Sequence, residues 1–324
     1  MKKYYLFILF AILASCTEKP SSQNTSEKQT KNTHQIETTS IVVLGTVQDA
    51  GSPHIACTRA CCADLFDHPT TKRQVVSLGL IDADNKKTYL FEATPDISRQ
   101  MKKLTTLGNQ GERELVDGIF ITHAHIGHYT GLMYLGKEAM DARSTPVYVM
   151  PRMKNFLREN GPWSQLVSGE NILLHEMQNE MPVQLSDQIE ITPFLVPHRN
   201  EYSETVGFKI KGPAKTALFI PDINKWDIWE KDIVEEVRKV DYAFVDATFF
   251  SGEEINHRDI GQIPHPFIIE SFETFEGLSM EDKNKIIFIH FNHTNPVLNQ
   301  ESEEAQLVIK KGYRIARIDD IFEL

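Results

Sequence analysis

The fold and the chemistry of this 324-residue chain are decided by one stretch, Ile119-Phe120-Ile121-Thr122-His123-Ala124-His125-Ile126-Gly127-His128. Its apolar, β-branched start predicts a buried strand. Three histidines follow within six residues. A strand end that runs into a tight loop can direct several imidazoles at one point, as a divalent metal ion requires. A single histidine is more often a core or surface residue, but this spacing favours a metal site.

The spacing of His123, His125 and His128 resembles the His-x-His-x-Asp-His motif of the metallo-β-lactamase fold. The resemblance extends over about residues 40–324 and implies an α/β domain built as a four-layer αββα sandwich. Gly127 stands where the family has an aspartate that ligates a second metal ion. Because glycine has no ligand atom, we expect the second site to bind its ion more weakly than the first.

Length and composition suit this fold. With 41% hydrophobic residues, the chain has ample core for one large α/β domain or two small ones. Apolar periodicity predicts helices that alternate with buried strands, as an α/β architecture requires. The expected helices include residues 97–107, 226–237, 266–275 and 303–310.

Polar residues follow several predicted strands at the point where each strand ends. They are His123, His198, Asp222, Asp246 and His290. Residues at strand ends along one edge of a sheet layer form a single cleft. The family resemblance assigns His123, His125, His198 and Asp222 to the first metal, and Asp222, His128 and His290 to the second.

Two acids are candidates for orienting a ligand imidazole from behind, a role that metal-binding histidines usually require. Glu92 follows a predicted strand at the place where the family has a buried acid, and Asp96 is the alternative. Asp96 is equally well explained as the N-cap of the helix over residues 97–107.

The cysteines suggest a separate metal site. Cys57, Cys61 and Cys62 form an odd, clustered set, which pure disulfide pairing does not explain in an exported protein. The loop that carries them and the segment 290–296 resemble the pyrroloquinoline-quinone biosynthesis protein B group, which is close to phosphoribosyl cyclic phosphodiesterase and to ribonuclease Z. That resemblance implies a structural zinc held by Cys57, Cys61, Cys62 and His293, with His54 as a spare ligand.

This chain also departs from the protein B group. Members of the group lack the first two motif histidines and keep the aspartate, whereas this chain has both histidines and lacks the aspartate. We therefore expect a relative of the group with a different metal site, so the function of the group does not transfer safely to this chain.

The N-terminus has the features of an export signal. Lys2 and Lys3 precede an apolar run over residues 6–13, which is too short to span a bilayer comfortably. Leu13-Ala14-Ser15-Cys16 resembles a bacterial lipoprotein cleavage box, which implies a signal peptide over residues 1–15 and lipidation of Cys16. An ordinary secretory signal is the alternative. Polar residues 16–39 then form a tether, and the protein is expected at the bacterial cell envelope, held to the membrane by its lipid.

Charge and motifs together favour a metal-dependent hydrolase that acts on a small molecule. The formal net charge of −11 argues against a nonspecific nucleic-acid binder. We expect zinc-bound hydroxide to attack a phosphodiester or related ester, with Asp222 at the metal and His265 as general acid; His257 is the second choice for the acid. The alternatives are an oxygenase with iron (or a manganese site) and a non-catalytic metal-binding lipoprotein.

Overall fold

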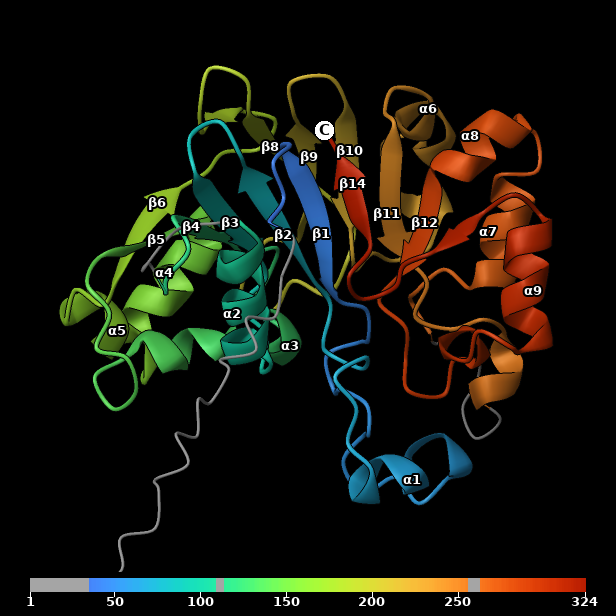
Figure 1. The fold of residues 1–324 in the computed structure, drawn as a ribbon, viewed down its shortest axis with the longest axis horizontal. Coiled ribbons are helices and arrows are strands. Elements are labelled where there is room, and N and C mark those ends of the chain that lie inside the picture. Colours follow the sequence, from blue (N-terminus) through green and yellow to red (C-terminus); the bar gives the residue numbers. More distant parts are fainter. Residues whose placement is uncertain (1–34, 109–113, 256–262) are drawn as a thin grey trace, which may run out of the picture. The chain divides into compact units, whose positions relative to one another are not determined.

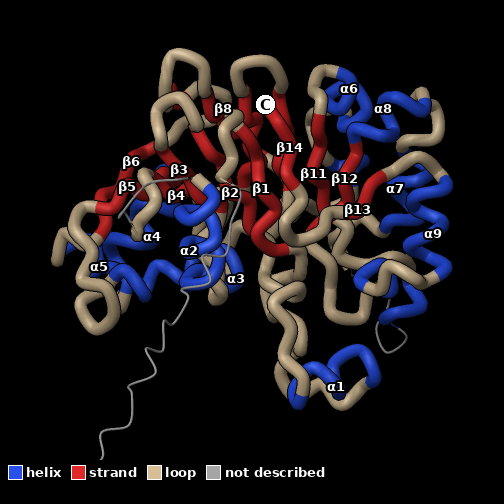
Figure 2. Tube along the Cα trace, in the orientation of Figure 1, coloured by secondary structure: helices blue, strands red, loops and turns tan. Residues whose placement is uncertain are grey.

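The computed structural model describes residues 35–108, 114–255 and 263–324. Within these residues, two seven-stranded sheets pack face to face, and helices cover their outer faces (Figures 1 and 2). This is the four-layer αββα arrangement that the sequence predicts.

The first sheet contains the N-terminal half of the domain and the last strand of the chain. Its strand order is β14-β1-β2-β3-β4-β5-β6. The strands are β1 (Ser40–Gly45), β2 (Ser77–Asp82), β3 (Lys87–Phe91), β4 (Gly118–Phe120), β5 (Thr145–Val149), β6 (Ile172–Glu176) and β14 (Ile321–Glu323).

The second sheet is built from the C-terminal half in the order β13-β12-β11-β10-β9-β8-β7. Its strands are β7 (Val183–Gln184), β8 (Glu190–Leu195), β9 (Val206–Lys211), β10 (Thr216–Ile220), β11 (Tyr242–Asp246), β12 (Ile286–Ile289) and β13 (Arg314–Ile315).

The helices are short. The α-helices are α1 (Ala60–Asp67), α2 (Ile97–Leu107), α3 (Ile126–Tyr129), α4 (Pro151–Glu159), α5 (Trp163–Ser168), α6 (Ile233–Arg238), α7 (Ile268–Thr274), α8 (Met280–Lys285) and α9 (Glu303–Lys310). The 3-10 helices within the described residues include η1 (Thr130–Leu135), η2 (Trp226–Ile228), η3 (Gly252–Ile255) and η5 (Pro296–Leu298). No helix in the described ranges has the length and apolarity needed to cross a bilayer.

Three apolar layers hold the sandwich together. The central layer lies between the sheets and contains the stacked rings of Phe91 and Phe120, with Phe208 and Phe219 packed edge-on against Phe91. A second layer joins the first sheet to α2, α4 and α5, and a third joins the second sheet to α6, α7 and α9. Burial of these side chains provides the main driving force for the fold.

Strand register brings the functional side chains to one edge. β10, β11 and β12 are parallel, with Ile220 beside Val245 and Asp246 beside Ile289. The residues that follow, Asp222 and His290 among them, therefore emerge side by side. β3 and β4 are also parallel, so Glu92 leaves the first sheet next to the segment that leads into His123.

The helix expected over residues 226–237 is interrupted. The structure has η2 at its start and α6 at its end, because Asp232 begins a new helix. The Asp232 carboxylate accepts hydrogen bonds from the backbone N–H groups of Val234 and Glu235 and so caps α6.

The N-terminal predictions fall mainly outside the described residues, which begin at residue 35. The signal peptide and lipidation at Cys16 belong to that part of the chain. The end of the expected tether contacts the domain, since the Ile36 N–H donates to the Leu107 carbonyl at 3.0 Å and the Leu324 N–H donates to the Thr39 carbonyl at 2.9 Å.

Candidate metal centre

The structure brings the four predicted ligands of the first metal together. One donor atom from each of His123, His125, His198 and Asp222 lies within 4.8 Å of the others. Asp222 Oδ2 is 3.2 Å from His198 Nε2, 3.4 Å from His123 Nε2 and 3.9 Å from His125 Nδ1. Three imidazoles and one carboxylate in this arrangement suit a divalent transition metal.

The second group contains an unpredicted member. His128, Asp222 and His290 converge as expected, and Asp49 joins them from the loop after β1. Asp49 Oδ1 lies 3.0 Å from His128 Nε2 and 3.3 Å from His290 Nε2. Asp49 thus adds a second carboxylate to the two imidazoles and the shared carboxylate that were expected in this group.

Of the two acids considered for a supporting role, Glu92 is the one that faces a ligand. Its Oε1 is 3.4 Å from His128 Nδ1, and both side chains are fully buried. Asp96 instead accepts a hydrogen bond from the Val75 backbone N–H at 2.8 Å. It occupies the N-cap position of α2 without making a side-chain cap bond.

Other supporting groups were not predicted. Short polar side chains hold the Nδ1 edges of the ligand rings: Thr122 at His123 (2.8 Å), Asn224 at His198 (3.1 Å) and Thr248 at His290 (2.9 Å). Such hydrogen bonds fix ring orientation and tautomer. Thr122 directly precedes His123, but Asn224 and Thr248 lie 26 and 42 residues from the histidines they contact. Threonine and asparagine are also too common at strand ends to be recognised as partners beforehand.

His265 lies beside the shared carboxylate. Its Nδ1 is 2.8 Å from Asp246 Oδ2 and 3.3 Å from Asp222 Oδ1. Burial opposes the charged ring, but Asp246 and then Asp222 raise the pKa of His265. The alternative acid, His257, lies outside the described residues. His265, Asp246, Asp222 and His290 also form a third group of closely spaced donor atoms.

The backbone is strained where two of these side chains leave their strands. Glu92 has φ 77° and His290 has φ 69°, in the left-handed region that non-glycine residues seldom adopt. Strain of this kind is retained where the surrounding structure requires it and clusters at functional sites.

The centre gathers three carboxylates whose negative charge must be balanced. Histidines are the ion-pair partners of three buried or half-buried carboxylates, those of Asp49, Asp222 and Asp246. Burial would raise the pKa of Asp49 and of Asp222, but neighbouring imidazoles hold both pKa values well below the usual range. Burial disfavours a charged His290, yet hydrogen bonds to Asp246 and Asp49 raise its pKa to about 10. Protons on the rings supply the balancing charge, and a divalent ion would do so in their place.

Unsatisfied atoms indicate where that ion fits. His123 Nε2 and Asp222 Oδ1 are buried without a hydrogen-bond partner. Burial, and then His128, hold the pKa of His123 well below its usual value, so its imidazole is neutral and its lone pair is available. Buried polar atoms normally have partners. Neutral imidazole nitrogens beside ionised carboxylates are the donors a zinc ion takes.

The predicted structural-zinc residues also converge. Donor atoms of Cys57, Cys61, Cys62 and His293 lie within 4.8 Å of one another, and Cys61 Sγ is 3.9 Å from each of the other two sulfurs. Thiolates around one zinc at about 2.3 Å would lie roughly 3.8 Å apart. His293 Nδ1 is buried without a partner, and burial lowers the pKa of His293 to about 4. Neutral His293 and the three sulfurs therefore fit zinc.

His54 is not one of these donors. Its Nδ1 lies 2.9 Å from the Ile55 carbonyl oxygen, and its ring packs on that of His293 with centroids 4.4 Å apart. The His54 backbone N–H donates to Cys62 Sγ at 3.3 Å. This residue therefore packs against the cysteine cluster and stabilises it from outside.

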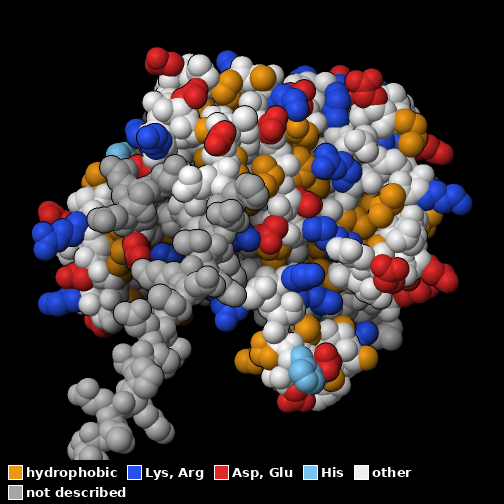
Figure 3. Space-filling model, in the orientation of Figure 1, with side chains coloured by type: hydrophobic (Ala, Val, Ile, Leu, Met, Phe, Trp, Pro, Cys, Tyr) orange, Lys and Arg blue, Asp and Glu red, His pale blue; other side chains and the backbone are white. Residues whose placement is uncertain are grey.

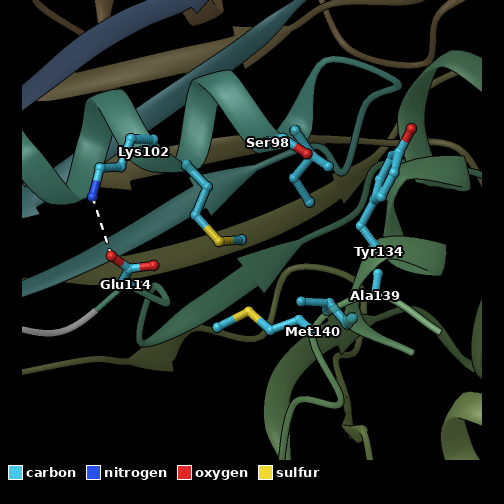
Figure 4. A pocket seen from close by; sticks show the side chains of 9 residues that line it. Ser98, Lys102, Glu114, Tyr134, Ala139 and Met140 are labelled. Carbon is cyan, nitrogen blue, oxygen red and sulfur yellow. Dashed lines mark hydrogen bonds and ion pairs between the residues drawn. The ribbon is translucent and has the colours of Figure 1, made fainter. Parts of the chain in front are cut away.

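One cavity borders the metal centre. It has a volume of about 510 Å³ and is lined by His198. Another, of about 520 Å³, lies at the cysteine cluster and is lined by Cys57 and His293. A third, of about 480 Å³, lies between α2 and η1 and is lined by Met101, Tyr134 and Met140 but by none of the proposed ligands (Figure 4). The first can admit a small molecule to the metal centre.

Comparison with known proteins agrees with this geometry. A sequence model described as "Beta-lactamase superfamily domain" matches residues 87–291. The chain belongs to the beta-lactamase superfamily. Among curated proteins similar to this chain, coenzyme PQQ synthesis protein B of Gluconobacter oxydans is 23% identical over 309 residues, which cover 88% of this chain and 98% of the relative. The corresponding protein of Ruegeria pomeroyi is 25% identical over 300 residues, which cover 85% and 97%.

Solved structures confirm the fold. Zn²⁺-bound PqqB from Methylobacterium extorquens superposes with a TM-score of 0.70 at 19% identity, covering 88% of this chain and all of the other. A diphosphatase from the PhnP family gives a TM-score of 0.60 at 21% identity, covering 88% and 97%. The predicted metallo-β-lactamase sandwich and the likeness to the protein B group are thus confirmed.

Proposed function

We propose that this protein is a metal-dependent hydrolase of phosphodiester or related ester bonds. The observation that carries the proposal is the shared position of Asp222, whose buried carboxylate belongs both to the group of His123, His125 and His198 and to the group of His128 and His290. Two ligand groups that share one carboxylate are suited to holding two metal ions close together. Such a pair of ions would stabilise the attacking and the leaving oxygens of a displacement reaction.

Zinc is the proposed ion. A zinc ion bound there would lower the pKa of a water molecule to about 7 and would polarise a phosphoryl oxygen of the substrate, which makes the phosphorus more electrophilic. The chain's own contribution is to hold these ligands rigidly. Thr122, Asn224 and Thr248 fix three of the rings, and Glu92 faces a fourth.

His265 is the proposed proton donor. Asp246 and Asp222 engage its Nδ1 edge, which leaves Nε2 for the leaving group. As water oxygen bonds to phosphorus, the phosphorus–oxygen bond to the leaving group breaks. The proton on Nε2 passes to the departing oxygen, so an alcohol and a phosphomonoester are formed.

The substrate class follows from the type of site and from the similar folds. Phosphoryl oxygens carry negative charge that two adjacent cations can stabilise in the transition state. A PhnP-family diphosphatase shares the fold, which supports phosphoester chemistry here. On the face shown in Figure 3, acidic and basic side chains are interspersed, which supports a small substrate rather than a nucleic acid.

Hydrolysis of bis(p-nitrophenyl) phosphate by the zinc-loaded protein tests the proposal. We expect the natural chain to hydrolyse the diester. The His125→Ala variant should show no turnover and should lose about one equivalent of metal. His68→Ala, in which an exposed histidine side chain is removed, serves as the control. Natural protein that contains iron, consumes oxygen and leaves the diester intact would instead establish the oxygenase alternative. Bound metal without turnover on any ester would support a binding protein.

We also propose that Cys16 anchors the protein to a bacterial envelope membrane. The support is the N-terminal sequence alone, with two lysines, an apolar run and Leu13-Ala14-Ser15-Cys16. In the native host, the full chain should fractionate with membranes and Cys16→Ser should not. Equal distribution of the two proteins would refute the anchor.

A further inference from the structure

We infer that Asp49 replaces the missing motif aspartate as a ligand of the second metal, and that Gly127 is glycine because Asp49 occupies the space of a residue-127 side chain. The inference rests on the metal centre proposed above but not on the reaction it performs. It reverses the expectation that the second site is deficient, since this site keeps two carboxylates and two imidazoles.

The first argument is the position of the Asp49 carboxylate. Its Oδ1 lies within hydrogen-bond distance of both His128 and His290, at 3.0 and 3.3 Å. The side chain is 11% exposed, so it is largely withdrawn from solvent. A carboxylate oxygen shared between two buried imidazoles is placed where a cation can bridge all three.

The second argument is steric. A Cβ atom built on Gly127 would lie 2.3 Å from Asp49 Cα, 2.6 Å from its Cβ and 2.8 Å from its Cγ. These distances are far below van der Waals contact. Gly127 is outside the left-handed region of φ, unlike Gly51 and Gly312, so backbone conformation does not demand glycine there. The close approach of Asp49 does.

The third argument is that the Asp49 loop is held in place. The Gln48 N–H donates to the Phe291 carbonyl, directly after His290, and the Phe291 N–H donates to the Thr46 carbonyl, each at 2.8 Å. The Gly51 N–H closes a turn onto the Gln48 carbonyl, also at 2.8 Å. The carboxylate is therefore presented by backbone that is hydrogen-bonded to the segment carrying another ligand.

These observations link the two positions. Asp49 fills the space beside Gly127 with its backbone Cα as well as its side chain, so no side chain at residue 127 fits while the Asp49 carboxylate lies beside His128. The loop after β1 supplies the carboxylate here. Glycine at position 127 of the motif leaves room for it.

Three variants test the inference by zinc content and by the visible absorption of the Co²⁺-substituted protein. We expect three zinc equivalents in the natural chain, counting the cysteine cluster, and two in Asp49→Ala. Gly127→Asp should also lose one equivalent, because the new side chain collides with the backbone and the side chain of Asp49. Asp84→Ala, at an exposed turn, is the matched control and should keep all three.

Thermal unfolding and near-UV circular dichroism establish that each variant is folded. Full second-site occupancy in Asp49→Ala would overturn the inference, as would full second-site occupancy in a folded Gly127→Asp variant. In either case the first site and the proposed hydrolysis would stand. Natural protein without metal at the histidines would remove the proposed function as well.

Discussion

Replacing His265 with glutamine tests the proposed proton donor without removing a predicted ligand of the first metal. The ring is held by carboxylates of Asp246 and Asp222, at 2.8 and 3.3 Å, whose side chains are 0% and 3% exposed. A proton donor held this firmly should supply a large share of the rate enhancement that general acid catalysis provides, which is roughly 10²–10⁴-fold. We expect a loss of about 10³-fold for a poor leaving group, or about 4 kcal/mol of activation free energy at ~1.4 kcal/mol per tenfold.

The assay compares two phosphodiesters that differ only in the acidity of the leaving alcohol. p-Nitrophenolate departs without a proton, so with that substrate His265→Gln should lose less than about tenfold, whereas the alkyl leaving group should show the full loss. Zinc content is measured in parallel because His265 contacts Asp222, and His68→Gln serves as the control. Equal losses on both substrates at unchanged zinc content would refute the role of His265 as proton donor.

Three other changes probe the supporting structure. Cys57→Ser should remove one zinc equivalent by elemental analysis and lower second-site occupancy, because the same loop carries Asp49; unchanged zinc would contradict the cysteine site. Glu92→Gln should weaken second-site zinc about 10–100-fold in a chelator competition, since Glu92 faces His128 at 3.4 Å. Gly131→Ala should lower stability to thermal unfolding by about 1–3 kcal/mol, because its Cβ would lie 2.1 Å from a backbone carbonyl oxygen.

Much of the site could be predicted because its ligands obey a simple geometric rule. His123, His198, Asp222 and His290 each follow an apolar strand, and parallel strands end at a common edge. The register of β10, β11 and β12 shows this directly, with Asp246 beside Ile289. Order along the chain was therefore enough to predict proximity in space.

Asp49 could not be predicted by the same reasoning, although a signal was present. It also follows a buried strand, β1. The cysteines in the same loop, however, point to a separate structural zinc site and not to the metal centre. Gly127 indicates only that a ligand is missing. Which distant residue replaces it depends on the packing of the β1 loop against Phe291, and no local sequence preference encodes that contact.

The helix over residues 226–237 shows a second limit. Its apolar spacing is helical throughout, yet a capping aspartate at 232 starts a new helix. Local periodicity identifies the buried face of a segment, whereas competing side-chain hydrogen bonds decide where the helix begins.

The most direct test of the metal centre is anomalous diffraction at the zinc edge from crystals of the purified protein. We predict one peak among His123, His125, His198 and Asp222, a second among Asp49, His128, Asp222 and His290, and a third at the cysteine cluster. Zinc-replete crystals with no peak among the histidines would contradict a metal centre at this edge of the sheets.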